Sequence, residues 1–210
     1  MLAISIGTAL PSIISTLCGA SNVTITDHPS SPALTNGAIQ ANIAKNLNVE
    51  TRKKVEVCGY VWGTETMYTA DAYGRVAGKL ETYERIVLAD CLWMPSQHAN
   101  LVRTVGRALG EGDDCCAIVV AGFHTGRGVV RDFFDVATSG WAGGDVSEGD
   151  GVDGGKVSDV GEGKQLLKLK VEEIFEIDVN GRRREWERAK PGEGKEEAKK
   201  WCVVAILVRP

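Results

Sequence analysis

The sequence predicts an α/β fold with a doubly wound sheet of about seven strands, mostly parallel and ending in an antiparallel C-terminal strand pair. Short apolar runs alternate with segments of helical periodicity, the pattern of a parallel sheet covered by helices. The run at 115–122 is continuously apolar, as in a strand buried on both faces. No helix-length pattern separates the last two runs, at 166–179 and 201–208, so these should pair antiparallel.

The first half of the chain is expected to alternate strands and helices. Its elements are, in order, a strand at 2–6, a helix at 10–17, a strand at 22–26, a helix at 34–47 and a strand at 54–61. Gly7, Asp27 and Trp62-Gly63 directly follow these three strands. Residues 64–82 are rich in Tyr, Gly and Thr, so we expect a loop there.

The second half continues the alternation. Its elements are a strand at 83–92 ending near Asp90, a helix at 96–109, a strand at 115–122, a helix through Val136, and the strands at 166–179 and 201–208. Asn180-Gly181 predicts a chain reversal. Residues 139–163 contain almost no large apolar side chain, which predicts a flexible acidic loop. Residues 190–200 are charged on every face and are expected to be solvated, the alternative being contact with an acidic partner.

Composition predicts a single domain over residues 1–210 and argues against several classes of partner. A content of 43% apolar residues is ordinary for a globular chain. A net charge of -4 gives no support for nucleic acid or an anionic membrane as partner. Gly7, Pro11 and Gly19 interrupt the apolar N-terminus, which argues against a membrane span.

The six cysteines form no C-x-x-C pair, so the spacing of a zinc site is absent and no metal is expected. Cys58, Cys91 and Cys202 lie in apolar runs, as buried free thiols do, which favours a reducing, cytoplasmic location. The first 26 residues carry no charged side chain, which favours a signal peptide, but they lack the basic segment with which a signal peptide begins.

A ligand of such a sheet binds outside the carboxyl ends of the strands. There Gly7 allows close approach of the backbone, and Asp27, twenty residues later, can accept both hydroxyls of an adenosine ribose. Nicotinamide and methionine cofactors share this arrangement. The alternative is that Gly7 is a tight turn and Asp27 a loop cap.

Five segments that lie at the predicted strand ends carry a family resemblance. They are Gly7-Thr8-Ala9-Leu10-Pro11-Ser12, Ile25-Thr26-Asp27, Val61-Trp62-Gly63, Ala89-Asp90-Cys91-Leu92-Trp93 and Ala121-Gly122-Phe123-His124-Thr125-Gly126-Arg127. In this order the chain resembles the seven-stranded lysine methyltransferase-like family. More narrowly, it resembles the fungal nicotinamide N-methyltransferase-like branch, which includes the enzyme that methylates the N-terminal amine and a nearby lysine of translation elongation factor 1-alpha.

The resemblance implies a Rossmann-like fold, S-adenosyl-L-methionine as cofactor and translation elongation factor 1-alpha as partner. It places Gly7 in the family's glycine loop, Asp27 on the ribose, Trp62 beside the adenine and Ala89 at a contact after the fourth strand. Asp90 and Trp93 would face the methyl acceptor and form the catalytic site. The alternatives are that Asp90 caps the following turn and that Trp93 fills the edge of the sheet.

The departures from the family pattern fall at the cofactor loop. Ser5 and Ile6 stand where the family has Gly and Ala, and the family's preceding N-terminal segment is absent. The β-carbon and branched side chain of Ile6 should weaken cofactor binding. Two explanations are a sequence started too late within its gene and a diverged chain that folds without catalysing.

The sequence therefore predicts a class I N-methyltransferase that acts on a protein amine. Alternatives are a small-molecule, nicotinamide-like N-methyltransferase and a non-catalytic protein that retains the sheet and docks on a translation factor. A nicotinamide-cofactor oxidoreductase would share Gly7 and Asp27 but does not account for the reversed terminal strands. His124 is expected to be a hydrogen-bonded loop residue, in preference to a general base.

Overall fold

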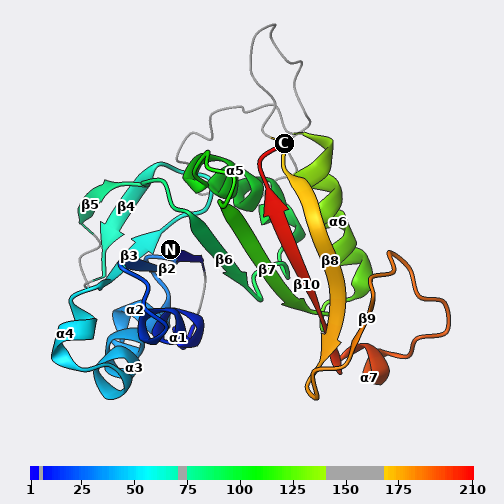
Figure 1. Cartoon of the computed structure of the whole chain (residues 1–210), viewed down its shortest axis with the longest axis horizontal. Coiled ribbons are helices and arrows are strands. Elements are labelled where there is room, and N and C mark those ends of the chain that lie inside the picture. The colour runs from blue at the N-terminus through cyan, green and yellow to red at the C-terminus, as the bar shows by residue number, and fades with distance from the viewer. Residues whose placement is uncertain (5–6, 71–74, 141–167) are drawn as a thin grey trace, which may run out of the picture.

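A computed structural model describes residues 1–4, 7–70, 75–140 and 168–210. Within these residues one ten-stranded sheet has the order β5-β4-β3-β2-β1-β6-β7-β10-β8-β9 (Figure 1). The seven consecutive strands from β3 to β8 in this order form the predicted doubly wound sheet. The prediction of an α/β fold is thus confirmed, and three further strands extend the sheet at its edges.

The centre of the sheet is parallel. It comprises β3 (Val55–Tyr60), β2 (Val23–Asp27), β1 (Leu2–Ile4), β6 (Arg85–Ala89) and β7 (Cys116–Gly122). Strand order reverses at β1, which pairs with β2 on one side and with β6 on the other. The carboxyl ends of β2, β3, β6 and β7 therefore lie along one edge of the sheet, where a ligand is expected.

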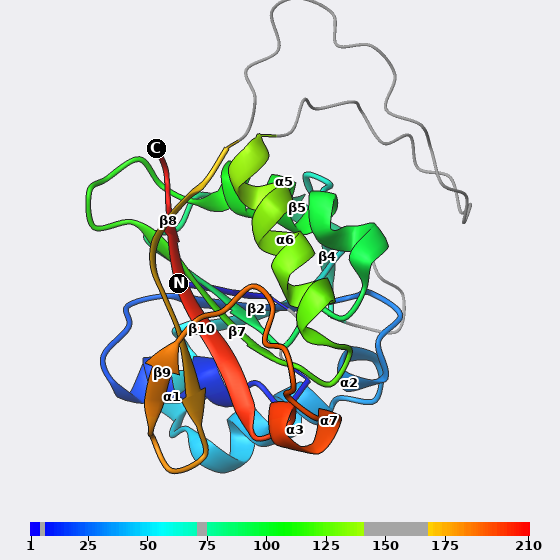
Figure 2. The same ribbon diagram turned by 90° about the vertical axis from the view of Figure 1, so that its right-hand side faces the viewer.

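Helices cover both faces of this sheet, as Figure 2 shows for α5 and α6 on one side and α1 and α3 on the other. The helices are α1 (Leu10–Leu17), α2 (Pro32–Thr35), α3 (Ala38–Asn46), α4 (Val49–Arg52), η1 (Pro95–Gln97), α5 (His98–Ala108) and α6 (Arg127–Ser139). Successive side chains of a strand point to opposite faces of the sheet, and each face has its own hydrophobic core. Leu2 and Ile4 pack in the core with α5 and α6, whereas Val23 and Ile25 pack with α1 and α3.

The predicted antiparallel C-terminal pair is present as β8 (Lys170–Asp178) and β10 (Trp201–Val208). β10 inserts between β7 and β8 and is antiparallel to both. The short strand β9 (Arg183–Glu185) returns along β8 after the turn at Asn180-Gly181, and α7 (Lys195–Ala198) precedes β10.

The prediction of a loop over 64–82 was wrong for the described part of that segment. β4 (Thr66–Thr69) pairs antiparallel with β3, and β5 (Val76–Lys79) pairs with β4. Met67 is buried with Cys58 and Tyr60, which provides the apolar contact that holds the first of these strands. β5 is exposed along its whole length, so it has no hydrophobic pattern from which to predict it.

Other differences concern boundaries. The predicted helix at 34–47 is two helices, because Gly37 takes a left-handed conformation (φ 71°) between α2 and α3. The predicted strand at 2–6 is described only as far as Ile4. The predicted acidic loop at 139–163 lies outside the described residues, apart from Ser139, which ends α6, and Gly140.

A buried cluster of four charges fixes the end of the sheet near β9. Glu176 of β8 is fully buried between the guanidinium groups of Arg127 and Arg184. Nε of Arg184 donates to Glu176 Oε2 at 2.7 Å, and Nη2 of Arg127 donates to the same oxygen at 3.2 Å. Nη2 of Arg127 also donates to Glu193 at 2.6 Å. The cluster therefore joins α6, β8, β9 and the segment before α7.

Most of residues 190–200 are exposed, as predicted, but Glu193 is an exception because its side chain belongs to this cluster and is only 6% exposed. Burial alone would raise the pKa of Glu193, but hydrogen bonds from Arg127 and Arg184 outweigh it and hold that pKa below its usual value. Burial would lower the pKa of Arg127, but its bonds to Glu176 and Glu193 raise it. Glu193 is therefore ionised in the folded chain at neutral pH.

All six cysteines are free thiols, with Cys58 and Cys91 buried and Cys202 partly buried. Burial raises the pKa of Cys58 and of Cys91 to about 12, so both remain protonated.

The helices of the described residues include none with the length and apolar character of a membrane span. In the same residues no three His, Cys, Asp or Glu side chains are grouped so as to hold a metal ion.

Replacing Glu176 by Gln should lower the free energy of unfolding by about 3 kcal/mol, because two buried guanidinium groups would then share the charge of Glu193 alone. Urea denaturation would measure the change. Glu173→Gln is the matched control on the same strand, since Glu173 is 50% exposed and lies 3.8 Å from Arg183. It should change stability by less than about 0.5 kcal/mol. Equal losses in the two variants would contradict a structural role for the cluster.

Candidate functional site

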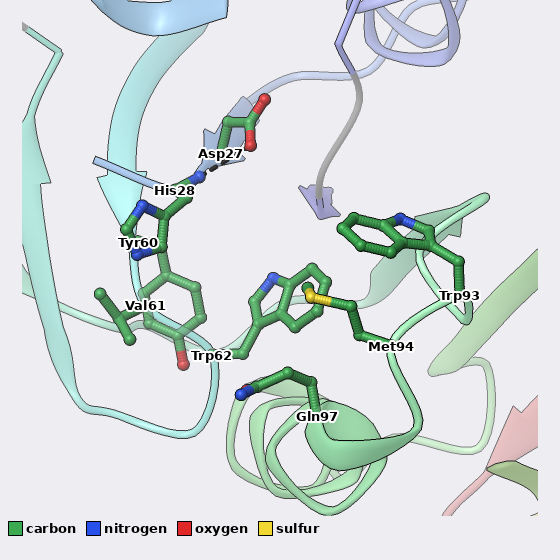
Figure 3. Close-up of a pocket in the computed structure, with 8 residues that line it drawn as sticks. All are labelled: Asp27, His28, Tyr60, Val61, Trp62, Trp93, Met94 and Gln97. Atoms are coloured by element: carbon green, nitrogen blue, oxygen red, sulfur yellow. Dashed lines mark hydrogen bonds between the residues drawn. The ribbon is translucent and has the colours of Figure 1, made fainter. Parts of the chain in front are cut away.

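A cavity of about 550 Å³ opens at the carboxyl edge of the sheet (Figure 3). Its lining comes from the ends of three strands. The lining residues are Asp27 and His28 after β2, Tyr60, Val61 and Trp62 at the end of β3, and Trp93, Met94 and Gln97 after β6. An aromatic wall with one carboxylate suits a ligand that has a flat ring and adjacent hydroxyl groups.

Asp27 ends β2, and both of its carboxylate oxygens have partners in the following turn. Oδ1 accepts from the backbone N of His28 at 2.7 Å, and Oδ2 accepts from Ser31 Oγ at 3.1 Å. Asp27 therefore does cap the loop that follows β2, as the alternative interpretation predicted. A carboxylate has further acceptor capacity on each oxygen, and Asp27 also lines the cavity, so capping and ligand binding are compatible.

Trp62 owes its position to a turn that is anchored on α5. The backbone N of Gly63 donates to Thr104 Oγ1 at 2.8 Å, and Arg107 donates to the Gly63 carbonyl at 3.0 Å. Tyr60 Oη lies 3.1 Å from the same Thr104 hydroxyl. Gly63 has φ 84°, where an L residue is strained. Glycine at this position thus permits the turn that carries Trp62 into the cavity.

The segment after β6 carries Asp90 and Trp93, and a buried histidine holds it. Nε2 of His98, which is 2% exposed, lies 2.9 Å from the Leu92 carbonyl and donates to it. The His98 ring also meets Phe133 edge-on, with centroids 5.6 Å apart. Trp93 remains 49% exposed at the cavity, which is unusual for so large an apolar side chain.

Asp90 itself has a left-handed backbone (φ 54°), a conformation that Asp and Asn tolerate better than most residues. Its Oδ1 accepts from the backbone N of Gly122 at 3.2 Å and lies 3.8 Å from Nδ1 of His124. The carboxylate is therefore directed toward the end of β7. It stands beside the aromatic cavity without lining it.

A second cavity, of about 430 Å³, lies on the far side of His124. It is formed by the segment after β7, the first turn of α6 and the segment from Arg188 to Lys199. Its charged lining is basic except for Glu193. Both cavities lie at the carboxyl edge of the sheet, and His124, which lines the second one, is 3.8 Å from Asp90.

The structure brings together three of the residues predicted to form the site, namely Asp27, Trp62 and Trp93. Ala89 ends β6 and pairs with Val120, and Asp90 follows it. Gly7 is exposed, and a β-carbon at Gly7 would meet no atom within 4 Å, so the space beside it is open to a ligand. Ser5 and Ile6 lie outside the described residues, and their role stays a prediction.

Sequence reasoning missed the residues that position the site. Tyr60, Thr104 and His98 are buried polar groups whose hydrogen bonds hold the Trp62 turn and the segment with Trp93. His98 and Thr104 lie on the buried face of α5. The sequence signal that was available is that His98 and Thr104 are polar residues at positions where the helix is otherwise apolar. Buried polar groups require hydrogen-bond partners, so such residues indicate specific contacts.

Replacing Gly63 by Ala should destabilise the chain by about 1–2 kcal/mol, through the left-handed backbone and a clash with Asn100. The new β-carbon would lie 2.8 Å from Asn100 Oδ1. Gly78→Ala is the control, since a β-carbon there meets nothing within 4 Å. It should change stability by less than about 0.5 kcal/mol in the same thermal or urea unfolding measurement. A harmless Gly63→Ala would show that the turn is not constrained as described.

No protein-family model matches the chain. Among curated proteins it is similar to the protein N-terminal and lysine N-methyltransferase EFM7 of Cryptococcus neoformans var. neoformans serotype D, with 32% identity over 109 residues. That match covers 52% of this chain and 34% of the relative. The Schizosaccharomyces pombe protein of the same name is 27% identical over 141 residues, which cover 66% of this chain and 53% of the relative. The chain thus matches about a third to a half of the length of these relatives.

Two solved structures share the fold across the whole chain. The [4+2]-cyclase SpnF superposes with a TM-score of 0.55 at 8% identity, covering 100% of this chain and 73% of that protein. The O-methyltransferase segment of StiE (residues 961–1257) gives a TM-score of 0.53 at 8% identity, covering 99% of this chain and 67% of that one. At this identity the likeness concerns the fold alone, and the two proteins are named for different reactions. The chain is thus similar in sequence to part of these fungal enzymes and shares its fold with the two solved structures.

Proposed function

We propose that this chain is an S-adenosylmethionine-dependent N-methyltransferase that acts on a protein amine. The observation that carries the proposal is the meeting of Asp27 and Trp62 in one cavity at the edge where the strand order reverses. The names of the similar fungal proteins support a protein N-terminus or a lysine as acceptor. Translation elongation factor 1-alpha is the acceptor protein that the family resemblance implies, and its N-terminal peptide is the first substrate to test.

The residues that line the aromatic cavity fit such a cofactor in chemical type. Asp27 would accept hydrogen bonds from the ribose hydroxyls, and the Trp62 ring would cover the adenine. The open space beside Gly7 allows close approach of a ligand to the backbone. When bound, S-adenosylmethionine supplies an electrophilic methyl group.

The acceptor side of the site would be formed by Asp90 and Trp93. The Asp90 carboxylate can accept a hydrogen bond from the incoming amine and orient its lone pair. Trp93 would exclude water from one side of that nitrogen, which favours the neutral amine over the ammonium ion. Asp90, or water beside it, would take up the proton that the amine loses when it is methylated.

Asp27→Asn should weaken binding of S-adenosylmethionine and S-adenosylhomocysteine by roughly 10- to 100-fold, because a charged acceptor of two hydrogen bonds is lost. Isothermal titration calorimetry on the purified chain measures this. Asp113→Asn, in the exposed turn before β7 at the opposite edge of the sheet, should leave the affinity unchanged. Absence of binding by the unaltered chain would count against catalysis and favour the protein that only docks on a partner.

Asp90→Asn should lower the turnover of a peptide amine by about 100-fold while cofactor affinity stays constant. Asparagine keeps the size of the side chain and tolerates the left-handed backbone, so the change isolates the charge. Methyl transfer to the elongation factor peptide would be followed by mass spectrometry. Unchanged turnover would remove Asp90 from the catalytic residues.

A further inference from the structure

The second cavity differs from the first in its charge. Its cationic lining residues outside the buried cluster are Arg131, Arg188, Lys190, Lys195 and Lys199. They come from α6 and from the segment that leads from β9 into β10, and Figure 2 shows α7 beside the lower end of α6, where that helix begins. Cations from two separate parts of the chain therefore converge on one hollow of about 430 Å³.

These cations are available to a ligand. Lys199 pairs with Glu196 at 2.6 Å, but the two side chains are 53% and 85% exposed. Arg188 pairs with Asp135 at 2.6 Å, again with both side chains about half exposed. Exposed pairs of this kind contribute only about 0–1 kcal/mol, so an incoming carboxylate can replace one partner. Among the described residues Lys195 has no ion-pair partner at all.

The floor of the cavity is rigid. Arg127 and Glu193 line it, and both belong to the buried cluster with Glu176 and Arg184. Their charges neutralise one another within the cluster, and the cluster fixes the direction in which the segment from Arg188 to Lys199 leaves the sheet. A preformed hollow costs less ordering on binding than a mobile one.

The cavity lies next to the proposed acceptor residues. His124 lines it, and Nδ1 of His124 is 3.8 Å from Asp90 Oδ1. A polypeptide whose amine is held at Asp90 can therefore continue along the sheet edge into the basic cavity. Carboxylate side chains are the groups of a protein that Lys and Arg bind best.

The surrounding charges favour carboxylates over a nucleic acid. The acidic partners Asp132, Asp135, Glu187 and Glu196 stand beside the cations, and the chain as a whole has a net charge of -4. A run of phosphates would be repelled by these acids and by the overall field, whereas one or two carboxylates fit between them.

We propose that the basic cavity binds an acidic segment of the acceptor protein, close in sequence to the amine that is methylated. This inference rests on the proposed function for its acceptor but concerns a separate binding surface. It defines the substrate class as amines that are followed or preceded by Asp or Glu within a few residues. The contact would set affinity and register and would leave the chemical step to the other cavity.

Binding of fluorescein-labelled ten-residue peptides with a free N-terminal glycine provides the test. A pair of glutamates is placed at positions 3–4, 5–6 or 7–8, and each peptide has a counterpart with glutamine. Anisotropy at low salt, with S-adenosylhomocysteine present, should show at least one glutamate peptide binding about tenfold more tightly than its counterpart. Equal binding within every pair would overturn the proposal.

The double variant K195Q/K199Q should abolish that preference. Lys53→Gln is the matched control, because Lys53 forms a similar exposed pair with Glu50, three residues away, at 2.9 Å. A similar loss in Lys53→Gln would indicate bulk charge and contradict the proposal, as would tighter binding of a ten-nucleotide RNA than of any peptide. Peptide binding does not require methyl transfer, so calorimetry with S-adenosylhomocysteine on the same samples separates a failure of the proposed function from a failure of this inference.

Discussion

Strand β1 is the element on which the two halves of the molecule depend. Its three residues pair with β2 on one side and with β6 on the other, so their hydrogen bonds join the half of the sheet that ends in Asp27 to the half that leads into Asp90. The same strand separates the two cores, with Leu2 and Ile4 on the side of α5 and Ala3 in register with Ile25 on the side of α1. The strand order reverses here, and that reversal opens the sheet edge where both cavities lie.

The two cavities are held in place by different kinds of interaction. The aromatic cavity is positioned by hydrogen bonds to α5, from Gly63 to Thr104 and Arg107 and between His98 and Leu92. The basic cavity is positioned by the charged cluster around Glu176, whose partners come from α6, β9 and the segment before α7. The anchors of the aromatic cavity thus come from one helix, whereas the buried cluster pairs its own charges and leaves the exposed lysines around the basic cavity outside it. Asp90 lines neither cavity and lies 3.8 Å from His124, which lines the basic one.

Much of the sheet could be predicted from sequence, because its buried strands are sharply bounded apolar runs. The limits of β10 agree with the predicted 201–208, and Asp27 could be proposed because it ends an apolar run twenty residues after Gly7. Trp62 was assigned to the site by the family resemblance. β5 could not be predicted, since all four of its residues are exposed and only pairing with β4 defines it. Glu193 looked solvated because its partner Arg127 is 66 residues away, and no local pattern reports such a contact. His98 escaped notice for a related reason, as its partner is a backbone carbonyl.

β10 lies between β7 and β8, although it follows both in the chain. During synthesis on the ribosome, β8 and β9 leave the exit tunnel before the strand that connects them to the rest of the sheet. Until β10 arrives, one long edge of β7 and one of β8 have no hydrogen-bond partners, and such edges readily pair with other chains. The strand β10 (Trp201–Val208) is apolar throughout. A nascent or misfolded chain therefore exposes three aggregation-prone segments together, namely β7, β8 and β10. Expression yield should therefore depend on how quickly this last strand inserts, more than on any residue of the two cavities.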